Sequence, residues 1–305
     1  MVSESRAGPA FPPLPLEEWE ETKETLHRYA QIVGKVRLGY TPFRNHWWHV
    51  PLYVSTRGLT TSPIPHRHMT FEISFDLLGN RLVASTSEGE GFEFALDDLP
   101  VAEFYRRLFD GLGALGIDLS INPKPFDLDD EHTLAENTFH CVCDRQYVRR
   151  YWRVLVQVDQ IFKEFAGRFN GKTSPVHLFW HGFDLAVTRF SGRRAPERDG
   201  ADKVTRQAYS HEVISFGFWP GDRNTAAPAF YSYTAPEPDG LTEQPLRPEP
   251  AFWAPEGGMA LLMYDDLRKA DSPKTTLLDF MESAYQAGAR TASWEVEDFR
   301  TEPDR

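Results

Sequence analysis

The sequence predicts an α+β protein of two tandem pseudo-repeats, each with a helix, about four mostly antiparallel strands and a closing helix, packed as one compact unit. The main observation is an ungapped alignment of residues 39–57 with residues 171–189, at a constant offset of 132. In each half, a strand that begins with histidine follows this segment, and an Asp-Asp-Leu motif leads to a later helix. The shared order of these features indicates an internal duplication.

The aligned segments share a Trp-His pair and a Thr-Arg pair. Gly39, Thr41, Trp48, His49, Thr56 and Arg57 recur as Gly171, Thr173, Trp180, His181, Thr188 and Arg189. We therefore divide the chain into a flexible tail at 1–15, a first α+β repeat at 16–145, a second α+β repeat at 146–298 and a short tail at 299–305.

Each half is expected to begin and end with a helix. Apolar residues recur with helical spacing in 16–33 and 146–165, and again in 101–115 and 275–289. The Asp-Asp pairs at 97–98 and 265–266 precede the two later helices, where carboxylates cap free N–H groups and complement the helix dipole.

The strand prediction is clearest at 68–78, where one apolar and one polar residue alternate throughout. The apolar set is Met69, Phe71, Ile73, Phe75 and Leu77. Such alternation suits an antiparallel sheet with one face on helices. Gly-Asn at 79–80 predicts a hairpin after this strand, and 211–221 is expected to be the corresponding strand of the second half.

The two Trp-His segments differ in which face is apolar. In an unbroken strand over 49–57, His49 and Arg57 lie opposite the apolar residues, whereas in 181–189 the apolar residues share the face of His181 and Arg189. Either both faces of these strands are buried, or a bulge shifts the register in one copy.

Composition limits the classes of partner and compartment. The net charge of −12 and the pI of about 5.3 argue against nucleic acid or an anionic membrane surface as the main partner. The sequence contains no run of eighteen apolar residues and no signal-peptide pattern at its start. Only Cys141 and Cys143 are present, too close together for an unstrained disulfide, so a cytoplasmic location is expected.

The recurring polar residues form the predicted ligand site. Tryptophan and histidine have an apolar body and a polar tip, and arginine makes bidentate contacts with carboxylate or phosphate. We predict a pocket between the two repeats for a small organic ligand, anionic or aromatic. Its binding residues are Trp48, His49, Arg57, Trp180, His181 and Arg189, with Trp47, Phe218 and Trp219 as further walls. The partner is thus a small molecule, and the oligomeric state is not predicted.

A His-ligated metalloenzyme of hydrolase or oxygenase type is the first alternative. Antiparallel neighbouring strands bring His49 near His68 and His181 near His211, and imidazole is the commonest protein ligand of zinc, iron and copper. This alternative requires a transition metal such as zinc or iron as cofactor. The sequence has no Gly-x-Ser-x-Gly motif, Walker loop or dinucleotide-binding glycine loop, so no reaction and no catalytic residue is assigned.

The second alternative is a non-catalytic interaction protein that uses its proline-rich segment at 235–255. Five prolines between Pro236 and Pro250 exclude a central strand, and proline-rich segments serve in recognition. They equally suit a connection that covers a sheet.

Four long segments are specific enough to indicate a family. They read KTSPVHLFWHGFDLAVTRFSGRRAP (172–196), YSHEVISFGFWPGD (209–222), FYSYTAPEPDGL (230–241) and AYQAGARTASWEV (284–296). Together they resemble the bacterial family catalogued as domain of unknown function 5996, and the resemblance spans roughly 16–296. It implies a bacterial, cytoplasmic, single-chain protein and carries over no functional residue.

Overall fold

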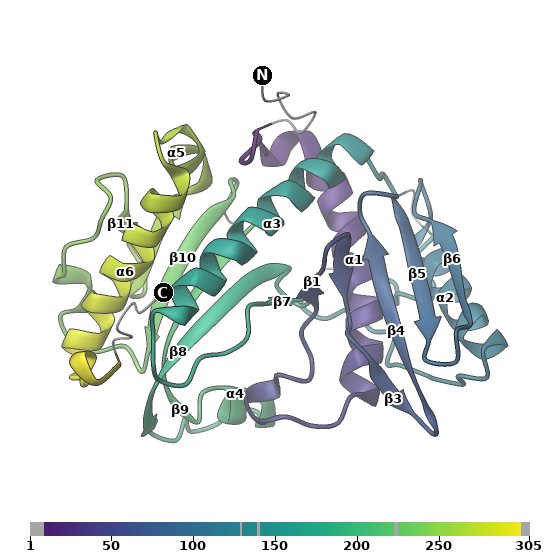
Figure 1. Ribbon diagram of the computed structural model, residues 1–305, viewed down its shortest axis with the longest axis horizontal. Coiled ribbons are helices and arrows are strands. Elements are labelled where there is room, and N and C mark those ends of the chain that lie inside the picture. Colours follow the sequence, from purple (N-terminus) through teal and green to yellow (C-terminus); the bar gives the residue numbers. More distant parts are fainter. Residues whose placement is uncertain (1–8, 129, 139–140, 223–224, 300–305) are drawn as a thin grey trace.

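The computed structural model describes residues 9–128, 130–138, 141–222 and 225–299, which form two antiparallel sheets and the helices packed on them (Figure 1). The α-helices are α1 (Leu16–Tyr40), α2 (Val101–Ala114), α3 (Arg145–Gly167), α4 (Lys203–Ala208), α5 (Tyr264–Lys269) and α6 (Pro273–Thr291). Short 3-10 helices are η1 (Asn45–Trp47), η2 (Leu241–Glu243) and η3 (Val296–Phe299).

The strands divide evenly between the two sheets. The first sheet contains β1 (Tyr53–Val54), β2 (Gly58–Thr60), β3 (Ile64–His66), β4 (Met69–Asp76), β5 (Arg81–Thr86) and β6 (Gly91–Ala95). The second contains β7 (His177–Phe179), β8 (Asp184–Arg194), β9 (His211–Trp219), β10 (Ala229–Ala235), β11 (Phe252–Trp253) and β12 (Met259–Met263). The predicted α+β class with mostly antiparallel strands is confirmed.

The two sheets have closely related strand orders. The first runs β1-β2-β4-β5-β6, with β3 also paired to β4, and the second runs β11-β12-β10-β9-β8-β7. The series β2-β4-β5-β6 thus matches the series β8-β9-β10-β12, and a helix follows the last strand in each half. The duplication itself stays a prediction.

An isolated bridge links the two sheets at their facing edges. Leu52 and Leu178 exchange both backbone hydrogen bonds, with N–O distances of 2.9 and 2.7 Å, and both side chains are fully buried. Because an unpaired strand edge invites intermolecular pairing, each half here covers an edge of the other. Residues of both halves also share one large hydrophobic core.

Helix α1 passes between the two sheets (Figure 1). Its contacts there explain the length of the helix and the glycine within it. The helix was predicted over 16–33 but continues to Tyr40, shortly before Pro42, which ends it. Gly34 lowers helix propensity, but a Cβ there would lie 2.2 Å from the Trp180 ring, so the glycine provides space for a residue of the second half. Tertiary packing therefore extends the helix beyond its local prediction.

The predicted alternation of the strand at 68–78 is confirmed. Phe71, Ile73, Phe75 and Leu77 are all at most 2% exposed. The hairpin at 79–80 is also confirmed, because Asp76 of β4 pairs with Arg81 of β5 across it.

The two Trp-His segments adopt different backbones. Residues 49–57 are not one strand, because Ser55 accepts hydrogen bonds from the N–H groups of Arg57 and Gly58 and turns the chain between β1 and β2. In the second half β8 continues to Arg194, with a register shift after Phe190. Both faces of β8 are buried, which explains why the apolar face differs between the copies.

The proline-rich segment lies at the margin of the second sheet. Its strand β11 pairs only with β12 among the described strands, at the sheet edge, as its prolines require. Ser283 of α6 hydrogen bonds to both the N–H and the carbonyl of Arg247. In the described part of the predicted tails, Leu14 is buried and Tyr264 donates to the Pro12 carbonyl at 2.7 Å; residues 1–8 and 300–305 lie outside the described residues.

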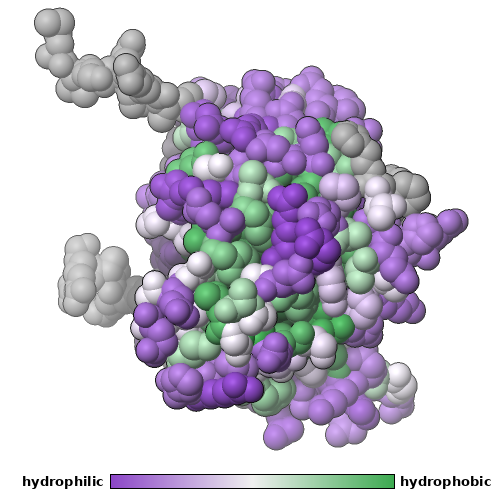
Figure 2. All heavy atoms as spheres, turned by 90° about the vertical axis from the view of Figure 1, so that its right-hand side faces the viewer, coloured by the Kyte–Doolittle hydropathy of each residue, from purple (hydrophilic) through white to green (hydrophobic). Residues whose placement is uncertain are grey.

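The outer face of the first half mixes apolar and charged side chains. Figure 2 views the molecule from the side of α2, β5 and β6 and shows small hydrophobic areas separated by hydrophilic ones. On α2, Glu103 pairs with both Arg106 and Arg107. None of the described helices is long and apolar enough to cross a membrane.

Candidate functional site

A cavity of about 570 Å³ lies between the two halves of the chain. One wall is a face of β7, β8, β9 and β10, and the other comes from the C-terminal part of α1, the segment around η1 and the short helix α4. Phe126, from the connection between α2 and α3, completes the lining. The volume is within the range of small-molecule sites.

Strand register decides which side chains reach this cavity. Thr188 on β8 lies opposite Ser215 on β9, which lies opposite Tyr233 on β10. The hydroxyl oxygens of Thr188 and Ser215 are 2.9 Å apart, and those of Tyr233 and Tyr209 are also 2.9 Å apart. A row of hydroxyl groups therefore crosses three strands on the cavity face. The alternate residues point to the opposite face, which packs against α3 and α6.

A carboxyl group and a tyrosine meet on the same wall. Tyr231 on β10 donates a hydrogen bond to Asp184 on β8, with an oxygen–oxygen distance of 2.5 Å, across the intervening strand β9. Gly217 on β9 makes this possible, because a Cβ there would lie 2.2 Å from the Tyr231 ring. Burial raises the pKa of Asp184, although the hydrogen bond from Tyr231 opposes the shift.

His177 is a buried polar group without a partner among the described residues. Its side chain is 1% exposed, and neither Nδ1 nor Nε2 is hydrogen bonded to a described residue. The ring lies edge-on to Phe179 and Tyr53 and lines the cavity. Burial lowers the pKa of His177 to about 3, so the imidazole is neutral at physiological pH. Buried polar groups are almost always hydrogen bonded, so two nitrogens without a described partner are an unusual feature of this wall.

Aromatic rings on a strained backbone form the opposite wall. Trp47 and Trp48 line the cavity, and His46 and Trp47 both have positive φ angles, of 55° and 60°. Lys172 donates to His46 Nε2 at 2.6 Å, and His46 Nδ1 donates to the Ala208 carbonyl at 3.3 Å. Left-handed backbone in bulky residues costs free energy and is concentrated at functional sites. These contacts hold the two tryptophans against the sheet.

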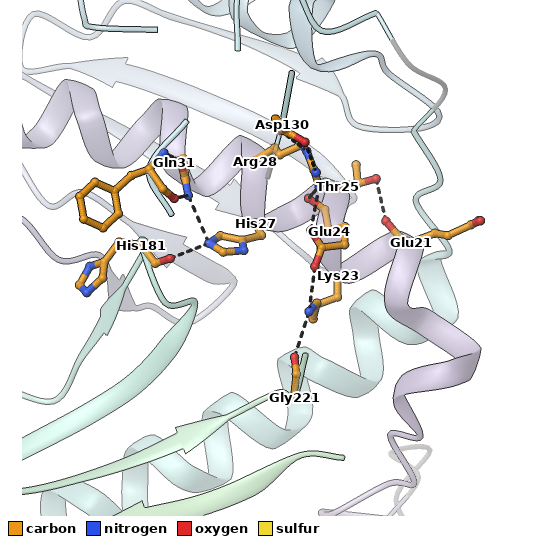
Figure 3. Close-up of polar contacts among 11 residues, drawn as sticks. Glu21, Lys23, Glu24, Thr25, His27, Arg28, Gln31, Asp130, His181 and Gly221 are labelled. Atoms are coloured by element: carbon orange, nitrogen blue, oxygen red, sulfur yellow. Dashed lines mark hydrogen bonds and ion pairs between the residues drawn. The ribbon is translucent and has the colours of Figure 1, made fainter. Parts of the chain in front are cut away.

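Buried polar side chains of α1 hold the loops at the cavity (Figure 3). His27 Nε2 donates to the His181 carbonyl at 3.0 Å. The amide of Gln31 both donates to the carbonyl of Phe126 and accepts from its N–H, each at 2.8 Å. Phe126 is thereby fixed while its ring stays 52% exposed beside Trp180 and His181.

Three of the predicted ligand residues line the cavity. Trp48 and Trp180 contribute walls, and the exposed His181 lies at its margin beside Phe126. Trp180 is 4% exposed and donates through Nε1 to the Val50 carbonyl at 3.1 Å, which fixes the ring.

The other three lie elsewhere. His49 is buried next to Trp47, with Nδ1 accepting from the Arg44 N–H at 3.3 Å, and burial lowers its pKa. Arg57 forms an ion pair with Asp76 at 2.8 Å on the surface of the first sheet. Arg189 is 1% exposed on the helix-facing side of β8.

Arg189 is held by contacts with α3 and α6, although its Nε lacks a hydrogen-bond partner among the described residues. Its guanidinium lies 3.5 Å from the centre of the Phe165 ring and 4.5 Å from that of Tyr285, and it donates to the Phe165 carbonyl at 2.6 Å. Burial lowers its pKa to about 10, against the attraction of Glu282. The aromatic cage therefore binds α3 and α6 to the sheet. Of the other predicted walls, Phe218 is fully buried, and neither it nor Trp219 lines the cavity.

The four histidines of the metal hypothesis lie in different surroundings. His68 is exposed in the turn between β3 and β4, and His211 lies at the start of β9 beside His46, with 5.5 Å between ring centres. Within the described part of the chain, no three His, Cys, Asp or Glu side chains are grouped so that they could hold a metal ion.

The sequence did not single out most of the polar cavity residues. Ser215 lies on the strand predicted at 211–221, whereas no strand was predicted over the residues of β10 that include Tyr231 and Tyr233; their common face also depends on cross-strand register. A row of alternating tyrosines in FYSYT, at 230–234, was the available signal for a polar face within an aromatic strand.

Comparison with known proteins identifies the family. The model of the family of unknown function DUF5996 matches residues 11–301, nearly the whole chain. The chain belongs to the DUF5996 family. The matched region includes both sheets and every described residue that lines the cavity, so the site belongs to the DUF5996 region itself. No curated protein and no solved structure shows significant similarity to this DUF5996 chain.

Proposed function

We propose that this DUF5996 protein binds a small organic molecule with an aromatic or planar apolar part in the cavity between its two halves. The observation that carries the proposal is His177, a fully buried imidazole on the cavity wall whose two nitrogens have no partner among the described residues. A buried polar group in this position is stabilised when a bound molecule supplies the missing hydrogen bond.

The rest of the lining supports a ligand of this kind. Small-molecule sites are mostly apolar with a few convergent polar groups, and here tryptophan and phenylalanine rings face a wall that carries hydroxyl groups and one carboxyl group. Trp47, on the opposite wall, also has a buried Nε1–H that lacks a described partner. Planar apolar ligands stack on such rings.

The proposal keeps the aromatic part of the sequence prediction. The prediction of a negatively charged ligand depended on Arg57 and Arg189, and neither guanidinium lines the cavity. The ligand is therefore defined by the aromatic walls and by His177 rather than by the arginines.

Blocking the cavity tests this proposal. Ala208 lines it from α4, so Ala208→Trp should fill part of its volume and abolish binding of any ligand found by native mass spectrometry or ligand-observed NMR. Arg206→Trp is the matched control, because Arg206 is exposed on the same helix and does not line the cavity. Equal binding to both variants would show that the ligand occupies another site.

A further inference from the structure

The carboxyl group of Asp184 is the main unexplained charge in the cavity. It lies at the first position of β8, directly after Phe183, whose φ of 58° is also in the left-handed region. Among the described residues, Asp184 accepts a side-chain hydrogen bond from Tyr231, and its other neighbour of opposite charge is His181, at the margin of the cavity. The carboxyl group is half-buried, and a carboxylate taken out of water is stabilised by a ligand that supplies a close cation.

Three charged or titratable groups on the opposite wall already have contacts of their own. Asp202 caps α4 by accepting from the N–H groups of Val204 and Thr205. Lys35 reaches in from α1 and lies 5.8 Å from the centre of the Trp180 ring. His46 is occupied by Lys172. Asp184 is thus the cavity carboxyl group that keeps acceptor capacity for a ligand.

The rings around this carboxyl group suit a cation. Phe179 lies opposite Asp184 on the neighbouring strand, and the Tyr231 ring lies against Gly217. The Tyr233 ring stacks next to that of Tyr231 at 6.2 Å. Ammonium groups bind favourably over aromatic faces, and the attraction strengthens when water is excluded.

We propose that the ligand of this cavity is an amine that carries a positive charge, with its ammonium group paired to Asp184 and its apolar part against the tryptophans. This inference rests on the proposed function and adds the charge of the ligand to it. Burial favours the neutral form of an unoccupied Asp184, and the ammonium group stabilises the ionised form when it binds. The hydrogen bond from Tyr231 then orients the carboxylate.

Charge-matched probes separate this inference from the proposed function. Tryptamine, 3-methylindole and indole-3-propionate share one ring system and differ in charge, as do phenethylamine, ethylbenzene and 3-phenylpropionate. Their binding can be followed by ligand-observed NMR, and that of the phenyl probes also by intrinsic tryptophan fluorescence, to which Trp47 and Trp48 of the cavity contribute. We expect the amines to bind at least tenfold more tightly than the neutral and acidic members.

Two variants assign the charge preference to Asp184. Asp184→Asn keeps an acceptor for Tyr231 but removes the charge, so it should weaken amine binding at least tenfold and leave the neutral probes unchanged. Asp202→Asn is the matched control, because it removes a carboxylate from the opposite wall of the same cavity and asparagine also caps helices. Thermal unfolding of both variants verifies that they are folded.

The outcomes are distinct. Neutral or acidic probes that bind as tightly as amines, and that Ala208→Trp displaces, would overturn the inference and leave the proposed function intact. Acidic probes that lose affinity in Lys35→Gln would also overturn it, in favour of an anionic ligand held by α1. If no probe of any charge binds, both the inference and the proposed function fail. An amine preference that Asp184→Asn abolishes and Asp202→Asn preserves supports the inference.

Discussion

Acidification should destabilise this protein through His27, and the size of the effect follows from its burial. The imidazole lies on α1, is stacked on Phe183 with 5.2 Å between ring centres, and donates to the His181 carbonyl. Burial lowers its pKa from 6.5 to about 4, although Glu24 opposes the shift. The folded state therefore holds this histidine neutral over a range in which the unfolded chain binds a proton.

The sign and magnitude follow from linkage. Because the folded pKa is depressed, the stabilisation is fully present above pH 6.5, and it is lost as the pH falls from 6.5 towards 4. Each unit of pKa difference is equivalent to about 1.4 kcal/mol, so His27 alone should lower the free energy of unfolding by about 2 kcal/mol at about pH 5. Below pH 4 its contribution stops changing.

Chemical denaturation at several pH values measures this effect. His27→Gln keeps an N–H donor for the His181 carbonyl but does not titrate, so between pH 6 and pH 5 the variant should lose about 1.2 kcal/mol less stability than the parent protein. His68→Gln, in the exposed β3–β4 turn, is the control and should keep the parent slope. An unchanged slope in His27→Gln would refute the assignment of the acid sensitivity to this residue.

Two further predictions concern packing at the second sheet. Gly217→Ala should cost about 1–3 kcal/mol of unfolding free energy, because the added Cβ would lie 2.2 Å from the Tyr231 ring. Gly39→Ala, in open space near the end of α1, should instead be neutral or stabilise by about 0.5 kcal/mol, and equal effects of the two changes in urea denaturation would contradict this account. Arg189→Ala should cost about 2–4 kcal/mol, because it removes a side chain packed between aromatic rings. Arg57→Ala, exposed on the first sheet, should stay within about 0.5 kcal/mol, and a similar loss from both arginines, measured by the same assay, would show that the ring contacts of Arg189 do not stabilise the fold.

Most of the secondary structure was predictable because it depends on local periodicity. The alternation from Met69 to Leu77 and the helical spacing in 146–165 need no knowledge of the rest of the chain. The end of α1 was predicted too early, since Gly34 is unfavourable for a helix locally and favourable only against Trp180. Local propensity therefore predicts which helices and strands form, whereas tertiary packing determines the residue at which α1 ends.

The candidate site was only partly predictable. The recurrence of the Trp-His pair drew attention to Trp48, Trp180 and His181, which line the cavity. Recurrence alone does not state which way a side chain faces. Neighbouring residues of a strand point to opposite faces, and Arg189 points to the face of β8 that packs against the helices, away from the cavity. The Asp184–Tyr231 contact crosses a third strand, so it depends on a register that no local pattern encodes.

The position of α1 also has a consequence for synthesis on the ribosome. This helix emerges before both sheets, but its buried Lys23 donates to the carbonyl of Gly221, which lies 198 residues later, and the carbonyl partner of His27 lies 154 residues later. At ordinary translation rates of about 5–20 residues per second, Lys23 waits about ten to forty seconds for its partner. During that interval the nascent first half exposes the face of α1 that later packs against the second half, and the strand edge at Leu52 is unpaired. Exposed apolar surface and unpaired strand edges promote aggregation, so we expect chaperones to bind this part of the growing chain.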